Sequence, residues 1–191
     1  MLKQPRVGRV KTRLGHDIGK VRATWWFRHQ SLHLIRRMNS DRRWHLVLAV
    51  SPDREGMNSR IWPPGIMRLP QGRGDLGARM LSVFRRSGPG PMVIIGSDIP
   101  DIRRWHIADA FKTLKFSDAV FGPAMDGGFW LVGLRHSRPP IGMFNGVDWS
   151  TPDALAQSMT SLGNRRIGMV ETLHDIDNGA DLDRLQKSPG A

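Results

Sequence analysis

The chain has 191 residues, of which 39% are hydrophobic and 24% charged, and its formal net charge is +12. This length suits one domain, residues 1–191, with a buried core. No window is apolar enough to cross a bilayer, no apolar segment follows the basic N-terminus as in a secretory signal, and cysteine is absent. These features exclude a disulfide framework and a thiolate metal site, and they lead us to expect a cytoplasmic protein.

The positive charge arises from 29 basic against 17 acidic residues. Arginine predominates, and its guanidinium group matches phosphate geometry, so polyanionic partners are favoured. The basic residues are scattered and no nucleic-acid motif is recognisable, so we expect a phosphorylated small molecule rather than a nucleic acid. A compositional bias of the whole genome would give the same arginine excess.

The first stretch of interest is a basic loop that contains Gly8, Arg9, Lys11 and Arg13. A loop of this kind can place backbone N–H groups and cationic side chains around a phosphate, although its spacing is not that of a Walker A motif. A solvated basic tail is an equally good interpretation of the local chemistry.

Helical and strand patterns alternate along the rest of the chain. Residues 21–38 have helical spacing with Val21, Trp25, Leu32 and Ile35 on one face, and we expect Trp25 to pack in the core. Residues 54–70 read mostly as a loop. The other expected strands cover residues 46–50, 92–95, 119–121, 129–134 and 167–170, and the other expected helices begin near residues 76, 100, 151 and 180.

A glycine-rich segment with Gln71, Gly74 and Leu76 leads into the helix that begins near residue 76. A helix N-terminus after glycines offers free N–H groups and a positive dipole end, which suit a phosphate or the edge of a base. Simple capping by Asp75 explains the same residues.

Two acids follow apolar strands. Asp98 comes directly after the strand at 92–95, and Asp126 stands in a tight turn between the strands at 119–121 and 129–134. Ligands of open α/β sheets gather outside the carboxyl ends of the strands, so both acids are candidate site residues. Plain turn formation is the alternative interpretation of both acids. A third acid, Asp177, precedes the expected last helix, and helix capping is its simpler interpretation.

The alternation of strands and helices predicts a single-domain α/β fold with a mainly parallel sheet and helices on both faces. The histidines show no spacing typical of zinc ligands.

Six motifs stand in the order found in a poorly characterised bacterial family, which the chain therefore resembles over nearly its whole length. They lie at residues 5–14, 71–77, 96–101, 122–128, 148–151 and 175–177. The family has the glycosyltransferase-A fold of nucleotide-diphospho-sugar transferases, and some members are labelled arsenosugar-biosynthesis glycosyltransferases. It is similar to phospholactate and molybdenum-cofactor guanylyltransferases.

The resemblance implies a role for each matching residue. Gly8, Arg9, Lys11 and Arg13 would hold the phosphates of a nucleotide, Gln71, Gly74 and Leu76 would lie near its base or ribose, Asp98 would bind a metal ion, and Asp126 would be a second catalytic acid. The metal would be Mg²⁺ or Mn²⁺, which bridges a diphosphate and neutralises the charge on the leaving group.

The implied activity is a metal-dependent transfer of a sugar from a nucleotide-activated donor to a small-molecule acceptor. A nucleotidyltransferase resembling the guanylyltransferases, acting on a nucleoside triphosphate, is the first alternative. A non-catalytic domain that binds a nucleotide or nucleic acid is the second.

Two features depart from the family. Its basic loop follows an apolar first strand, whereas only Met1 and Leu2 precede Lys3 here. We therefore expect a truncated first strand, because the chain either lacks that strand or naturally starts upstream, and a lower stability or activity as a result. Phe129 and Trp130 stand where the family tends to have tyrosine, so a phenolic hydroxyl is lost.

Overall fold

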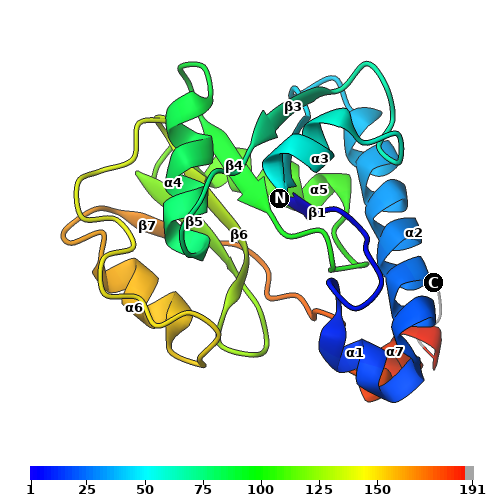
Figure 1. Ribbon diagram of the computed structural model, residues 1–191. Coiled ribbons are helices and arrows are strands. Elements are labelled where there is room, and N and C mark those ends of the chain that lie inside the picture. The colour runs from blue at the N-terminus through cyan, green and yellow to red at the C-terminus, as the bar shows by residue number, and fades with distance from the viewer. Residues whose placement is uncertain (188–191) are drawn as a thin grey trace.

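The computed structural model describes residues 1–187 as an α/β fold (Figure 1). The strands are β1 (Leu2–Lys3), β2 (Val47–Ser51), β3 (Met67–Pro70), β4 (Met92–Ile95), β5 (Ala119–Pro123), β6 (Phe129–Leu134) and β7 (Ile167–Met169). The helices are α1 (Thr12–Ile18), α2 (Lys20–Asn39), α3 (Asp53–Asn58), α4 (Leu76–Arg86), α5 (Arg104–Thr113), α6 (Ala154–Thr160) and α7 (Gly179–Lys187). The predicted fold class is confirmed.

The strands form two sheets, with the orders β1-β2-β3 and β4-β6-β5-β7. All pairs in the first sheet are parallel, whereas β6 runs antiparallel to both of its neighbours in the second. The short turn between β5 and β6 explains this difference, because a tight turn can join only antiparallel neighbours.

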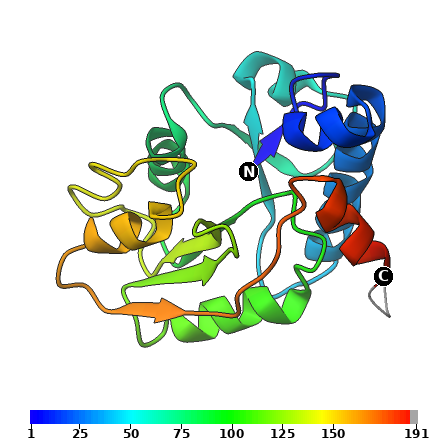
Figure 2. The same ribbon diagram turned by 90° about the horizontal axis from the view of Figure 1, so that it is seen from below.

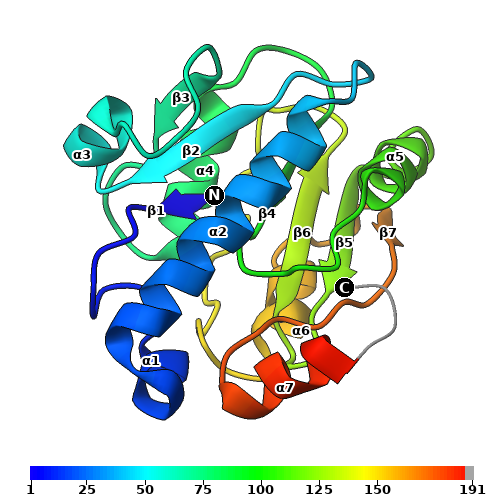
Figure 3. The same ribbon diagram turned by 90° about the vertical axis from the view of Figure 1, so that its right-hand side faces the viewer.

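Strand β1 is an edge strand of the first sheet and begins beside the end of β4 of the second sheet (Figure 3). Leu2 pairs with Val50 of β2, and the amino group of Met1 donates a hydrogen bond to the carbonyl oxygen of Ile95 at the end of β4. The first strand is thus present as two residues, which pair with the carboxyl end of β2.

Helices cover both faces of the sheets (Figures 1 and 3). Alternate residues of β5 show why: Val120 joins a core cluster with α2 and α5, whereas Ala119 and Phe121 join another with α4 and the segment around α6. Both faces of β5 are apolar and buried, as expected for a strand between two helical layers.

Helix α2 matches the predicted range, but the predicted buried face was wrong at its beginning. Phe27, Leu34 and Ile35 are buried, whereas Val21 is 57% exposed and Trp25 is 58% exposed. Trp25 stacks on His29 at 5.0 Å instead of packing in the core. The core stripe lies on the side of α2 that begins with Ala23, so Val21 and Trp25 fall on the opposite side.

The basic loop and the segment 54–70 contain more structure than the sequence indicated. The loop runs into α1, where Leu14 is fully buried against Ala23 and Ile176, and α3 and β3 occupy much of residues 53–70. Both missed helices are short, and short helices are stabilised by packing rather than by their own sequence pattern.

After β7 the chain runs back across the molecule to α7, which lies beside α1 (Figure 2). The Leu173 amide donates a hydrogen bond to the Pro123 carbonyl at the end of β5, and the Gly179 amide donates one to the Asp17 carboxylate at 2.8 Å. This return places residues 175–177 at the carboxyl ends of the central strands. None of the helices in residues 1–187 has the length and apolarity that a bilayer span requires.

Candidate functional site

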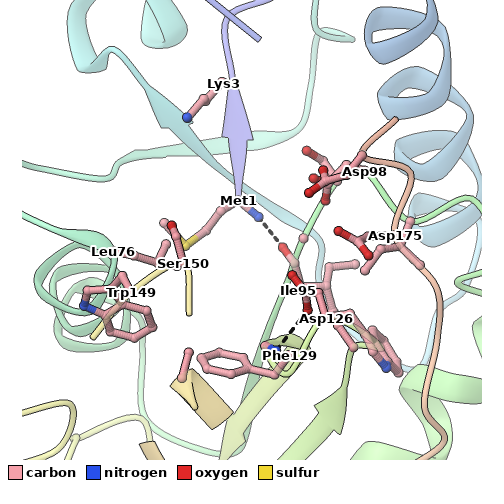
Figure 4. A pocket seen from close by; sticks show the side chains of 18 of the residues that line it. Met1, Lys3, Leu76, Ile95, Asp98, Asp126, Phe129, Trp149, Ser150 and Asp175 are labelled. Carbon is pink, nitrogen blue, oxygen red and sulfur yellow. Dashed lines mark hydrogen bonds between the residues drawn. The ribbon is translucent and has the colours of Figure 1, made fainter. Parts of the chain in front are cut away.

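A cleft of about 830 Å³ opens at the carboxyl ends of the strands. Its lining comes from β1, the basic loop, the start of α4, the end of β4, the turn after β5 and two C-terminal segments (Figure 4). This is the edge at which the sequence placed its two acids, and it is the usual ligand edge of an α/β sheet.

Lys11 is the centre of the charged side of the cleft. Its Nζ lies 2.8 Å from Asp98 Oδ2 and 2.8 Å from Asp177 Oδ1, and its side chain is only 7% exposed. The residue has a left-handed backbone with φ of 46°, a conformation that side-chain-bearing residues rarely adopt. Burial opposes the charged form of Lys11, but the two carboxylates outweigh it and raise its pKa above the ordinary value.

Three carboxylates gather beside this ion pair. Asp126, Asp175 and Asp177 each present an oxygen, and these atoms lie within 4.8 Å of one another. The Gly128 amide donates a hydrogen bond to Asp126 Oδ1 at 2.9 Å, which fixes the turn. Burial, followed by the charges of Asp177 and Asp126, raises the pKa of Asp175 to about 6. A divalent cation would relieve this repulsion, so the donor set fits Mg²⁺ or Mn²⁺.

The cleft unites most of the predicted site residues. Lys11, Arg13, Gln71, Leu76, Asp98 and Asp126 all line it, whereas Gly8, Arg9 and Gly74 are not among the described residues of the lining. Gly8 and Gly74 have positive φ angles of 73° and 103°, so both shape the loops that lead to the cleft.

The Gln71 side chain has a structural task. It is 3% exposed, and its Nε2 donates hydrogen bonds to the Leu2 carbonyl at 3.1 Å and the Ala49 carbonyl at 2.8 Å. The amide thereby ties β1 to β2 and leaves only its oxygen for a ligand.

The structure distinguishes the two acids for which helix capping was the simpler interpretation. Asp75 caps α4 by accepting a hydrogen bond from the Ala78 amide at 2.8 Å, as the simpler interpretation predicted. Asp177 does not act as a helix cap: its carboxylate binds Lys11 and Arg13, and it is Asn178 that accepts from the Asp181 amide.

Two parts of the cleft were missed by sequence reasoning about individual site residues. The first is Asp175, which is named only within the motif 175–177. The second is an apolar side on which Met80, Phe129 and Trp149 join the predicted residue Leu76, here called the aromatic wall. Trp149 lies in the motif 148–151, so the motif pointed to the segment but not to its role. The charged wall is the opposite side, made of Lys11, Arg13, Asp98, Asp126, Asp175 and Asp177.

Solved structures of other proteins share this fold. A crystal structure from Desulfovibrio desulfuricans G20, described as a "putative nucleotide-diphospho-sugar transferase", has a TM-score of 0.87 and 27% sequence identity, and the match covers 99% of this chain and 86% of that chain. Rv0371c from Mycobacterium tuberculosis H37Rv and its homologue from Mycobacterium sp. strain JC1 share the fold at 15% identity, with TM-scores of 0.55 and 0.53. Those two matches cover 85% and 83% of this chain, and 84% and 80% of the other chains.

A comparison with curated proteins finds no significant match. A family model described as "Uncharacterized protein conserved in bacteria (DUF2064)" matches residues 34–151, which is more than half of the chain. The matched range includes α4, β4, β5, β6, Asp98, Asp126 and Trp149. The chain belongs to this bacterial family.

Proposed function

We propose that the protein is a metal-dependent transferase that uses a nucleotide-activated sugar as its donor. The observation that carries this proposal is the charged wall, where Lys11 and Arg13 lie beside three clustered carboxylates at the ligand edge of the sheet. The name of the similar Desulfovibrio structure supports the same class of reaction. The specific likeness to arsenosugar-biosynthesis enzymes or guanylyltransferases stays a prediction from the sequence.

Asp175 and Asp177 would hold Mg²⁺ or Mn²⁺, and Asp126 lies beside them. When bound, the metal would supply positive charge against the diphosphate of the donor. The metal role implied for Asp98 remains a prediction, because its carboxylate pairs with Lys11 in the structure.

Lys11 would bind the donor phosphates directly. An ammonium group has three donors, and Asp98 and Asp177 engage two of them, which leaves one for a phosphate oxygen. The two acids also hold the ammonium at a fixed place, so little reorganisation is needed when charge builds on the leaving diphosphate. Arg13, whose side chain is 74% exposed, would add a second cation at the cleft entrance.

The transfer would replace the bond between the anomeric carbon and the diphosphate by a bond to the acceptor hydroxyl oxygen. The nucleoside diphosphate leaves with the electron pair, and a cleft carboxylate takes the hydroxyl proton. Asp126 is best placed for this task because it is the exposed member of the acidic cluster.

A thermal-shift screen tests the proposal. The purified chain is heated with UDP-, GDP-, ADP- and CDP-sugars and with the matching nucleoside triphosphates, each with and without Mn²⁺. We expect one sugar nucleotide to stabilise the chain only with Mn²⁺, by about 2.7 kcal/mol at a hundredfold excess over Kd. Stabilisation by a triphosphate alone, followed by release of pyrophosphate, would contradict sugar transfer and favour nucleotidyl transfer. A folded sample that responds to none of these ligands would contradict both.

A further inference from the structure

We propose that Trp149 and Ser150 form a subsite for the sugar ring of the donor, so that the cleft recognises the group to be transferred on its aromatic wall. The inference rests on the proposed function and adds to it the residues that distinguish a sugar nucleotide from a bare nucleotide. Both residues line the cleft (Figure 4).

Trp149 is held in place by packing on several sides. Its ring lies edge to face against Phe144 at 5.5 Å and against Phe129 at 6.2 Å. A Cβ added at Gly77 would stand 2.8 Å from Trp149 Cζ2, so α4 also presses on the indole. The ring is therefore a preformed surface rather than a mobile side chain.

The backbone around Trp149 is fixed as well. The Asp148 amide donates a hydrogen bond to Gln157 Oε1 at 2.7 Å, Gln157 Nε2 donates to Asp148 Oδ2 at 3.3 Å, and the Thr151 hydroxyl donates to the Asp148 carbonyl at 2.8 Å. These bonds hold the segment to α6 and close the turn.

Ser150 is an unusual residue within this turn. Its φ of 67° lies in the left-handed region, which serine adopts at a cost in free energy. Its side chain is exposed in the cleft, and its hydroxyl makes no hydrogen bond within the described part of the chain. A hydroxyl can both donate and accept, so Ser150 offers the pairing that a sugar hydroxyl needs.

The turn that carries Asp126 is packed against the same segment. The Leu155 amide donates a hydrogen bond to the Gly127 carbonyl at 3.0 Å, and a Cβ at Gly127 would overlap the Pro152 carbonyl. Ser150, Thr151 and Pro152 line the cleft between Trp149 and this turn, so a ring bound at Trp149 and Ser150 would extend along the segment toward Asp126. In a sugar nucleotide the sugar is bonded directly to the diphosphate, whereas the base is separated from it by a ribose. The part of the donor that follows the metal-bound diphosphate along this segment is accordingly the sugar.

The chemistry of the wall agrees with this choice. Phe129 and Trp149 present aromatic surface, which suits the carbon–hydrogen face of a pyranose, and Ser150 supplies a polar group at its edge. The phosphates find their partners on the charged wall instead.

Three ligands of increasing size test the subsite, because the second adds a nucleoside and the third adds a sugar. Isothermal titration with Mn²⁺ measures the Kd of pyrophosphate, of a nucleoside diphosphate and of the matching sugar nucleotide, in the pairs UDP with UDP-glucose and GDP with GDP-mannose. In Trp149→Ala we expect the sugar nucleotide to bind about tenfold more weakly, while Kd for the diphosphate and pyrophosphate stays within about twofold. Ser150→Ala should show the same pattern at about threefold.

Controls separate the subsite from the fold. Trp25→Ala removes an exposed tryptophan outside the cleft and should leave all three affinities unchanged. If circular dichroism shows that Trp149→Ala is unfolded, Ser150→Ala and Trp149→Phe decide, because Phe keeps an aromatic surface and should retain most of the sugar contribution.

Three results would overturn the subsite. If Trp149→Ala weakens the nucleoside diphosphate as much as the sugar nucleotide and leaves pyrophosphate unchanged, Trp149 binds the base. Sugar-nucleotide binding that survives Trp149→Ala and Ser150→Ala unchanged would remove both residues from recognition. A wild-type chain that binds the sugar nucleotide no better than the diphosphate would show that no sugar subsite exists. In the first two cases the proposed function stands, whereas binding of nucleoside triphosphates alone would end both.

Discussion

The two walls of the cleft are held together in different ways. The charged wall joins segments far apart in the chain through ion pairs, such as Lys11 with Asp98 and with Asp177. The aromatic wall is fixed by close packing of Trp149 against Phe144 and Gly77. Charged groups at such a wall can add a charged ligand as a further partner, whereas a packed ring cannot move without leaving a cavity.

This difference assigns separate tasks to the two walls. The charged wall offers the third ammonium donor of Lys11 to a diphosphate and the clustered acid oxygens to a cation, and the aromatic wall offers a surface of fixed shape. Substitutions on the charged wall should therefore affect turnover and ligand affinity more than folding. Substitutions that disturb the packing between the walls should affect folding first.

The largest expected effect is on turnover. Asp126→Asn keeps the acceptor for the Gly128 amide and removes only the charge. We expect kcat for release of nucleoside diphosphate from the sugar nucleotide to fall about 100-fold or more, as when one well-placed electrostatic group is lost. The matched control is Asp109→Asn, which changes an exposed acid on α5. Equal rates for Asp126→Asn and wild type would show that the Asp126 carboxylate has no role in turnover.

The next effect is on stability. Gly127 has φ of 85° and faces the Pro152 backbone, whereas Gly146 has φ of 71° and open space around it. Alanine at either position meets the same backbone strain, but only Gly127→Ala also meets a steric overlap. We expect urea denaturation to show that Gly127→Ala loses about 2 kcal/mol more unfolding free energy than Gly146→Ala. Equal losses would mean that the turn and the segment after Trp149 are not tightly packed.

Arg13 should contribute to affinity but little to folding. Its Nη1 lies 3.3 Å from Asp177 Oδ2 and its side chain is 74% exposed. Arg13→Ala should cost less than about 1 kcal/mol of unfolding free energy, because exposed ion pairs are weak. The Kd of the nucleoside diphosphate with Mn²⁺ should rise about tenfold, as for a lost charge-assisted hydrogen bond. Arg28→Ala, on the exposed side of α2, is the control; an equal rise there would attribute the effect to net charge alone.

The last expected effect depends on pH and concerns Asp175 in the metal-free protein. Its pKa is raised from 3.8 to about 6 by folding, chiefly through burial. Between these values the unfolded chain holds fewer protons than the folded one, so stability from this group falls as pH rises and stays lower above about pH 6. Asp175→Asn should therefore be more stable than wild type near pH 7.5 and equal to it near about pH 4. A gain of the same size at both pH values in urea denaturation would contradict the shifted pKa.

Much of the fold was predictable because it depends on local pattern. The apolar run Met92–Ile95 is β4, and Asp75 before a helical stripe is the cap of α4. The error at Trp25 has a physical cause. Spacing alone allows this residue on either side of α2, and its exposure depends on where the sheet lies.

The site shows the same division. The sequence by itself determined that Asp98 and Asp126 follow strands, because strand ends and turns are encoded by neighbouring residues. It also placed Lys11 and Arg13 in one basic segment, although Arg13 proves to lie in α1. Only the tertiary structure decided that Asp177 meets Lys11, and that Trp149 faces the cleft beside α4. Those contacts join residues far apart in the chain, and they are fixed by the return of the chain after β7 and by packing between helices, for which a local pattern carries no signal.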